Sequence, residues 1–98
     1  MLEKMTSSGS RDPFAWYGLA LEYRTLGRLE DSIRTFHTLR DLDPGYVPAY
    51  LMAAQTAKMA GRLDDAREWV QAGIAAAAAK GDGHALSELE SFAAEVGP

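Results

Sequence analysis

Apolar side chains recur along this chain at the spacing of one face of an α-helix. Between residues 82 and 96 they follow an i, i+3, i+4, i+7 order, with serine and glutamate on the opposite face. Trp16, Leu19, Tyr23 and Phe36 show helical spacing earlier in the chain. No strand pattern competes with these segments. The pattern predicts an all-α fold of five helices, over residues 13–26, 29–42, 47–60, 63–80 and 83–96.

Local signals mark where these helices begin and end. Asp12 is a capping residue that precedes Pro13, and proline favours the first position of a helix. Gly27 and Gly61 follow the first and third predicted helices, where a glycine in the left-handed conformation commonly ends a helix. The fourth helix meets no proline, so we expect it to continue through its alanines to about Lys80.

The sequence repeats itself with a period of 34 residues. The hexapeptide Gly-Arg-Leu-Glu-Asp-Ser at residues 27–32 falls on Gly-Arg-Leu-Asp-Asp-Ala at residues 61–66. The same shift places Trp16 on Tyr50 and Phe36 on Val70. Because the similarity extends to both sides of the hexapeptide, it indicates a duplicated unit rather than a chance match.

This unit resembles the tetratricopeptide repeat (TPR), a right-handed helix-turn-helix repeat of the same period. The first repeat, residues 13–46, matches the family pattern at Trp16, Leu19, Ala20, Tyr23, Ser32, Phe36 and Pro44. The second repeat, residues 47–80, keeps the small positions but has Ala78 where the proline stands. The resemblance implies one TPR-like α-solenoid domain of five antiparallel helices over residues 12–98. The residues before it, 1–11, are expected to form a flexible N-terminal arm. Residues 82–96 are expected to form a helix that caps the last repeat.

Small residues are expected where the two helices of each repeat cross. Ala20 is predicted to face Ser32, and Ala54 to face Ala66, because helices approach closely only where side chains are small. Two repeats and a cap fall short of the three repeats that usually suffice for independent stability. Association into a homodimer is therefore a further expectation.

Composition and charge narrow the class of protein. The 98 residues include no cysteine, which excludes disulfides and thiolate ligands. Residues 1–67 carry nine basic and nine acidic side chains, whereas residues 68–98 carry one and five, so no basic face for nucleic acid is expected. The longest apolar stretch is too short for a membrane span, and the N-terminus lacks the apolar core of a signal peptide. We therefore expect no membrane association and a cytoplasmic location.

Few residues of this chain suggest catalysis or metal binding. His37 and His84 lie on different predicted helices, and neither has a second ligand at metal-binding spacing. The acidic pairs at residues 30–31 and 64–65 stand in first helical turns, where the helix dipole favours negative charge. Glu30 is expected to pair with Arg34, four residues further on. We predict a protein that is not an enzyme, with no catalytic residue, no metal site and no cofactor.

The resemblance also implies where a partner would bind. In TPR domains the first helices of successive repeats line a concave groove that holds an extended peptide or a partner helix. The groove positions in this chain are Phe14, Tyr17, Leu21, Arg24, Leu51, Met52, Gln55, Lys58 and Met59. One TPR subgroup grips a terminal carboxylate with lysine and asparagine, but here Tyr17, Leu21 and Met52 occupy those positions. A carboxylate clamp is therefore not expected.

The leading hypothesis is an interaction module whose groove binds an apolar or amphipathic segment of another protein. Arg24 and Lys58, at the rim, would then select acidic flanks. The alternative is a homo-oligomeric scaffold whose groove is filled by its own arm or by a second copy. Trp69 is expected either to be exposed or to lie under the capping helix, and in that scaffold it would serve as a contact if it is exposed. An RNA-binding helical repeat is disfavoured by the missing basic face.

Overall fold

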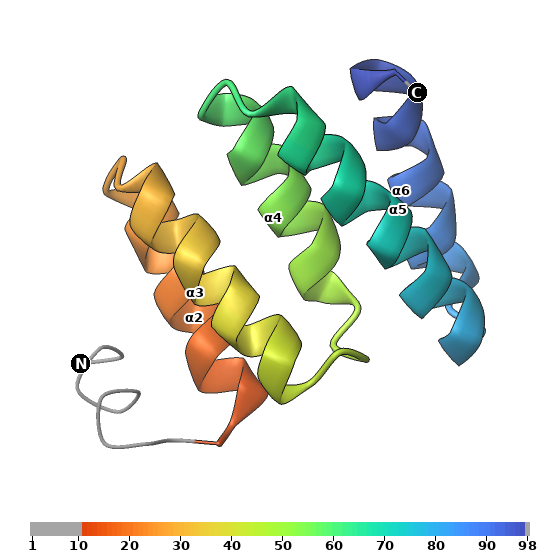
Figure 1. The fold of residues 1–98 in the computed structure, drawn as a ribbon. Coiled ribbons are helices and arrows are strands. Elements are labelled where there is room, and N and C mark those ends of the chain that lie inside the picture. Colours follow the sequence, from red (N-terminus) through yellow and green to blue (C-terminus); the bar gives the residue numbers. More distant parts are fainter. Residues whose placement is uncertain (1–10, 98) are drawn as a thin grey trace.

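The computed structural model describes residues 11–97, which form five α-helices (Figure 1). They are α2 (Pro13–Thr25), α3 (Leu29–Leu42), α4 (Pro48–Met59), α5 (Leu63–Lys80) and α6 (Gly83–Val96). The predicted all-α fold is confirmed, and every predicted boundary agrees within one residue. The predicted N-terminal arm lies almost wholly outside the described residues. Within residues 11–97, no helix is long and apolar enough to cross a bilayer.

The helix ends follow the local signals in the sequence. Asp12 caps α2, because its Oδ1 accepts a hydrogen bond from the backbone N–H of Phe14 at 3.0 Å. Gly27 and Gly61 have φ angles of +78° and +77°, in the left-handed region that other residues rarely adopt. Helix α5 continues to Lys80, as the missing proline predicts.

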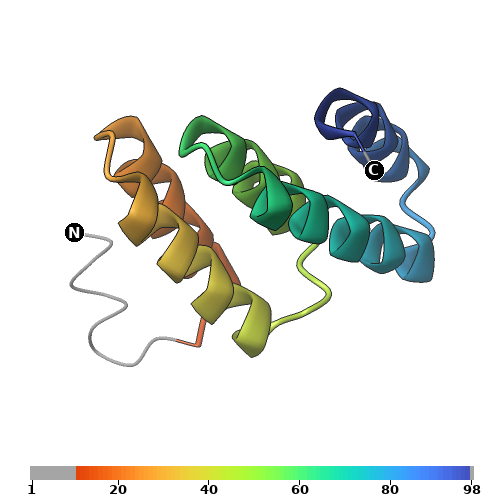
Figure 2. The same ribbon diagram turned by 45° about the horizontal axis from the view of Figure 1, so that its top comes forward.

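The helices pack as consecutive antiparallel pairs in two layers. Helix α2 pairs with α3 and α4 pairs with α5, while α6 packs against both α5 and α4. Figure 2 shows α2, α4 and α6 in one layer and α3 and α5 in the other. Alternate helices run in the same direction, so α2, α4 and α6 all begin at the lower edge in Figure 1. Their layer carries the candidate site.

Small residues allow the helices of each pair to approach closely. Ser32 Oγ donates a hydrogen bond to the carbonyl oxygen of Ala20 at 2.7 Å, and neither residue has exposed surface. The predicted contact between Ala20 and Ser32 is therefore confirmed. Ala54 and Ala66, the equivalent residues of the second pair, are also fully buried. A larger side chain at these crossings would push the helices apart.

The two repeats meet at Trp69 of α5, which is 1% exposed. Its indole ring packs against Phe36, His37 and Tyr50, with centroids 6.5, 4.8 and 5.9 Å away. The guanidinium of Arg40 lies 5.0 Å from the centre of the indole ring. The condition under which Trp69 would serve as a contact between copies, an exposed indole, is therefore not met. The ring fills the junction of α3, α4 and α5, so a second copy of the chain cannot reach it.

Ion pairs also join the two repeats at the surface. Arg40 of α3 binds Glu68 of α5 through two hydrogen bonds, of 3.0 and 2.9 Å. Glu30 of α3 pairs with Arg62, in the turn before α5. The expected pair between Glu30 and Arg34 is wrong, because Arg34 binds Asp31 at 2.8 Å. Glu30 instead reaches an arginine that only the stacking of the repeats brings near it.

The pair between Arg40 and Glu68 predicts a pH-dependent contribution to stability. The Arg40 guanidinium holds the pKa of Glu68 below its ordinary value. A carboxyl group of this kind stabilises the fold above its unfolded-state pKa, and this contribution disappears as the pH falls through the folded-state pKa. We expect Glu68→Gln to lower the free energy of unfolding at about pH 7 by less than about 1 kcal/mol, since the carboxylate is half exposed.

The loss caused by Glu68→Gln should be smaller at about pH 3 than at about pH 7, because Glu68 of the wild-type chain gains a proton as the pH falls through its lowered pKa. Urea unfolding of both proteins at the two pH values measures this difference. A loss of equal size at the lower pH would show that Glu68 acts through packing and not through its charge.

Candidate functional site: two cavities in one helix layer

Two cavities hollow the layer formed by α2, α4 and α6. The first cavity, of about 260 Å³, lies near the ends where these helices begin. The second cavity, of about 420 Å³, lies near the ends where they finish. The two cavities adjoin, because Arg24 of the second cavity places its Nη1 3.5 Å from the Sδ of Met52 in the first.

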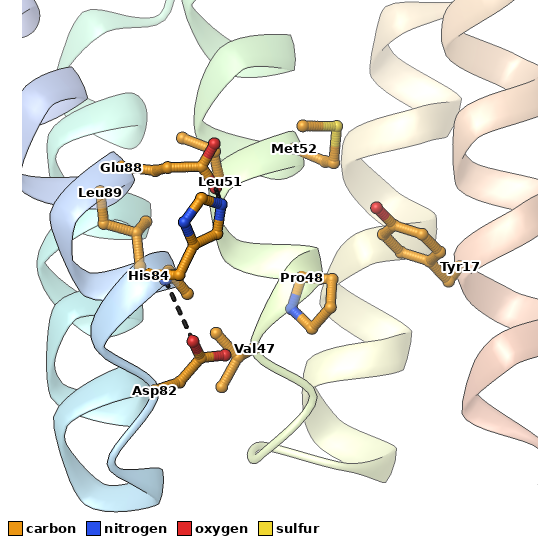
Figure 3. Close-up of a pocket in the computed structure, with 10 residues that line it drawn as sticks. Tyr17, Val47, Pro48, Leu51, Met52, Asp82, His84, Glu88 and Leu89 are labelled. Atoms are coloured by element: carbon orange, nitrogen blue, oxygen red, sulfur yellow. Dashed lines mark hydrogen bonds and ion pairs between the residues drawn. The ribbon is translucent and has the colours of Figure 1, made fainter.

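The first cavity has an apolar floor (Figure 3). Its apolar lining includes Val47, Pro48, Leu51, Met52, Ala85 and Leu89. Tyr17 of α2 faces this surface, and its ring is held by Tyr46 and Phe36, whose centroids lie 5.3 and 6.4 Å away. Burial raises the pKa of the Tyr17 phenol above its ordinary value. The hydroxyl therefore stays protonated at neutral pH and can donate a hydrogen bond to a ligand.

Helix α6 supplies the polar rim of the first cavity. Figure 3 shows Asp82, His84 and Glu88 on the side of the cavity opposite Tyr17. Asp82 caps α6, because its Oδ1 accepts a hydrogen bond from the backbone N–H of Ala85 at 3.1 Å. Nε2 of His84 lies 3.6 Å from Oε1 of Glu88. Asp82, His84 and Glu88 are exposed, so they are accessible to a partner above the apolar floor.

The sequence pattern assigns Glu88 to the solvated face of a capping helix, and it places no residue of 82–96 in the groove. One signal could have found the rim residues. Helix α6 directly follows the second repeat, so it takes the position of the first helix of a next repeat, and first helices line the groove. The register of that position is hidden because α5 has 18 residues where its counterpart α3 has 14.

The second cavity carries basic side chains that already have partners. Arg24 Nη1 donates a hydrogen bond to Gln55 Oε1 at 3.2 Å. Lys58 Nζ pairs with Glu95 at 3.2 Å and lies 5.8 Å from the centre of the Phe92 ring. Both cations that the sequence suggested for binding acidic flanks are therefore engaged within this chain.

Seven of the nine predicted groove residues line these cavities. Tyr17, Leu51 and Met52 belong to the first cavity, and Arg24, Gln55, Lys58 and Met59 belong to the second. Phe14 and Leu21 are not among the residues that line either one. Phe14 stands in the first turn of α2 and is 68% exposed, while Leu21 is half-buried against the core.

The two histidines have different surroundings. His37 stacks on Trp69 in the other layer, and His84 lies at the rim of the first cavity. Within residues 11–97, no three His, Asp or Glu side chains converge in a way that would hold a metal ion.

Comparison with known proteins agrees with this architecture. The family model described as tetratricopeptide repeat matches residues 23–89 of the chain. A TPR repeat-containing protein of Pseudomonas aeruginosa is 30% identical over 91 residues, which cover 93% of this chain and 87% of that protein.

Solved structures are similar over almost the same length. The NMR structure of a tetratricopeptide repeat domain protein from Salinibacter ruber is similar, with a TM-score of 0.82 at 30% identity. The aligned part covers 87% of this chain and 86% of that protein's chain. The structure of a protein from Bordetella parapertussis has a TM-score of 0.82 at 25% identity. The aligned part covers 97% of this chain and 83% of that protein's chain. The helix pair is duplicated, and the family model matches more than half of the chain. The chain therefore belongs to the tetratricopeptide repeat family.

Proposed function

We propose that this protein is a non-enzymatic interaction module that binds an apolar or amphipathic segment of another protein across the two cavities. Tetratricopeptide repeat domains generally act as protein–protein interaction modules. The observation that carries the proposal is the convergence of Tyr17, Leu51 and Met52, from two helices, on one cavity with apolar walls. Partly exposed apolar side chains gathered in a concave surface are typical of a binding site.

The shape and stiffness of the site support this proposal. The ring contacts that hold Tyr17 mean that little conformational freedom is lost when a partner binds. Met52 and Met59 add flexible apolar surface that adapts to irregular partners, and Met59 is 54% exposed. Because the cavities adjoin at Arg24 and Met52, one extended segment can occupy both.

The test combines Tyr17→Glu with Met52→Glu. Two carboxylates on the floor of the groove should weaken partner binding by at least about thirtyfold, the effect expected at the centre of an interface. Affinity capture from a lysate of the source organism, followed by mass spectrometry, identifies the partner, and titration measures its affinity. Circular dichroism and urea unfolding verify that the variant folds.

The matched control combines Gln71→Glu with Ala75→Glu. Both residues are exposed on α5, in the other layer, and the change in charge is the same. A partner held by wild type and control but lost by the groove variant supports the proposal. A partner retained equally by all three proteins contradicts it. Capture of further copies of this chain alone would favour the homo-oligomeric scaffold.

A further inference from the structure

We infer that the partner segment carries a lysine or arginine beside its apolar residue, and that Asp82 and Glu88 bind this cation at the rim of the first cavity. The inference rests on the groove binding proposed above and adds the charge of the partner. It reverses the expectation from the sequence, which was that basic residues of the groove select acidic flanks. The occupant is a segment of another protein.

The charges around the first cavity carry the argument. Among the residues that line it, Asp82 and Glu88 are acidic and none is lysine or arginine. The basic side chains of the groove, Arg24 and Lys58, line the second cavity instead, where Gln55 and Glu95 bind them. The two cavities therefore differ in charge. The first presents two carboxylates and no lysine or arginine, and its one lining histidine, His84, lies 3.6 Å from Glu88.

The helix ends near this cavity offset only part of that charge, because Glu88 lies beyond the first turn of α6. The beginnings of α2, α4 and α6 bring partial positive charges to this end of the layer. Asp12 and Asp82 cap α2 and α6 and so offset two of them. The cap uses one carboxylate oxygen of Asp82. Glu88 stands in the second turn of α6, and the influence of a helix dipole falls off within the first turn.

The form of the cavity suits a long basic side chain. The aliphatic stem of a lysine or arginine can pack on the partly exposed Leu51 and Ala85 while its charged end stays at the exposed carboxylates of the rim. Charge complementarity of this kind mainly selects partners and speeds their association. Two of the five acidic residues in the last third of the chain, Asp82 and Glu88, thus acquire a binding role.

The experiment selects peptides from a random library displayed on phage, using the full chain as bait. The strongest binder is synthesised in two forms, one with its lysine or arginine and one with methionine at that position. Both are titrated against wild type and against Asp82→Asn with Glu88→Gln, which keeps a capping residue at the start of α6. The control, Asp41→Asn with Glu90→Gln, removes the same charge from exposed residues that do not line the cavities.

We expect the selected peptides to be enriched in lysine or arginine next to an apolar residue. The cavity variant should bind the basic peptide about five- to tenfold more weakly than wild type, and the control should bind it like wild type. The methionine form should bind all three proteins within about twofold.

Three results would overturn the inference. The selected peptides could lack a basic excess, or the basic peptide could bind the cavity variant as tightly as wild type. Deletion of residues 1–10 could strengthen binding of every peptide, which would identify the chain's own N-terminal segment as the occupant. Failure of the proposed function is a separate result, since the peptides would then bind the variant with Tyr17→Glu and Met52→Glu as well as they bind wild type.

Discussion

Trp69→Ala is expected to lower the free energy of unfolding by about 3–5 kcal/mol, which is most of the stability of a small domain. The indole is 1% exposed and touches rings from two neighbouring helices. Its removal leaves a cavity at the junction of the two repeats, and Arg40 loses the ring over which its guanidinium lies. Urea unfolding followed by far-ultraviolet circular dichroism measures the loss without relying on tryptophan fluorescence.

Trp69→Phe separates ring packing from hydrogen bonding at the same position. Among residues 11–97, no acceptor lies within hydrogen-bond distance of the buried Nε1 of Trp69. A phenyl ring keeps much of the packing and gives up no bond within the protein, so we expect a smaller loss, of about 1–2 kcal/mol. Equal losses for Trp69→Ala and Trp69→Phe would contradict this account and would assign a binding partner to the indole N–H.

Gly73→Ala is expected to destabilise the protein although alanine is the better helix former. A Cβ atom on Gly73 would lie 2.6 Å from Cβ of Tyr50 and 2.9 Å from Cδ2 of Leu89. The Tyr50 Cβ is fixed to the backbone of α4, so the helices must move apart. Overpacking of this kind costs about 1–3 kcal/mol, against a gain of about 1 kcal/mol in helix propensity. We expect a net loss of up to about 2 kcal/mol, or a Tm lower by up to about 15 °C.

Gly83→Ala is the matched control for Gly73→Ala. A Cβ atom on Gly83 would meet no heavy atom within 4 Å, so the Tm should stay the same or rise slightly. Thermal unfolding of both variants distinguishes close packing from a general effect of replacing glycine in a helix. A Tm of Gly73→Ala at or above that of wild type would mean that α5 moves away from α4 and α6 without cost. Because Leu89 also lines the first cavity, Gly73 helps to set the shape of the groove.

The elements of this protein could be predicted because their signals are local. Asp12 and Pro13 begin a helix, and Gly27 and Gly61 end one, through interactions that reach only a few residues along the chain. The repeat of the unit at a fixed period indicated the resemblance to the tetratricopeptide family, and that resemblance implied how neighbouring helices pair. Most predicted groove residues on α2 and α4 line the two cavities for the same reason, since the family pattern places them by their position within a repeat.

Only the tertiary structure decided the features that depend on three helices at once. Trp69 is buried and Glu30 pairs with Arg62 because the stacking of the repeats brings distant residues together. The sequence does not show that Gly73 lies against Tyr50 and Leu89, which leave no room for a larger side chain. The sequence pattern assigns Glu88 to a solvated face, but in the structure Glu88 lines the first cavity together with residues of α4. Periodicity specifies which face of a helix is buried, but the direction in which a side chain meets its neighbours depends on the angles and offsets between helices, which no local pattern encodes.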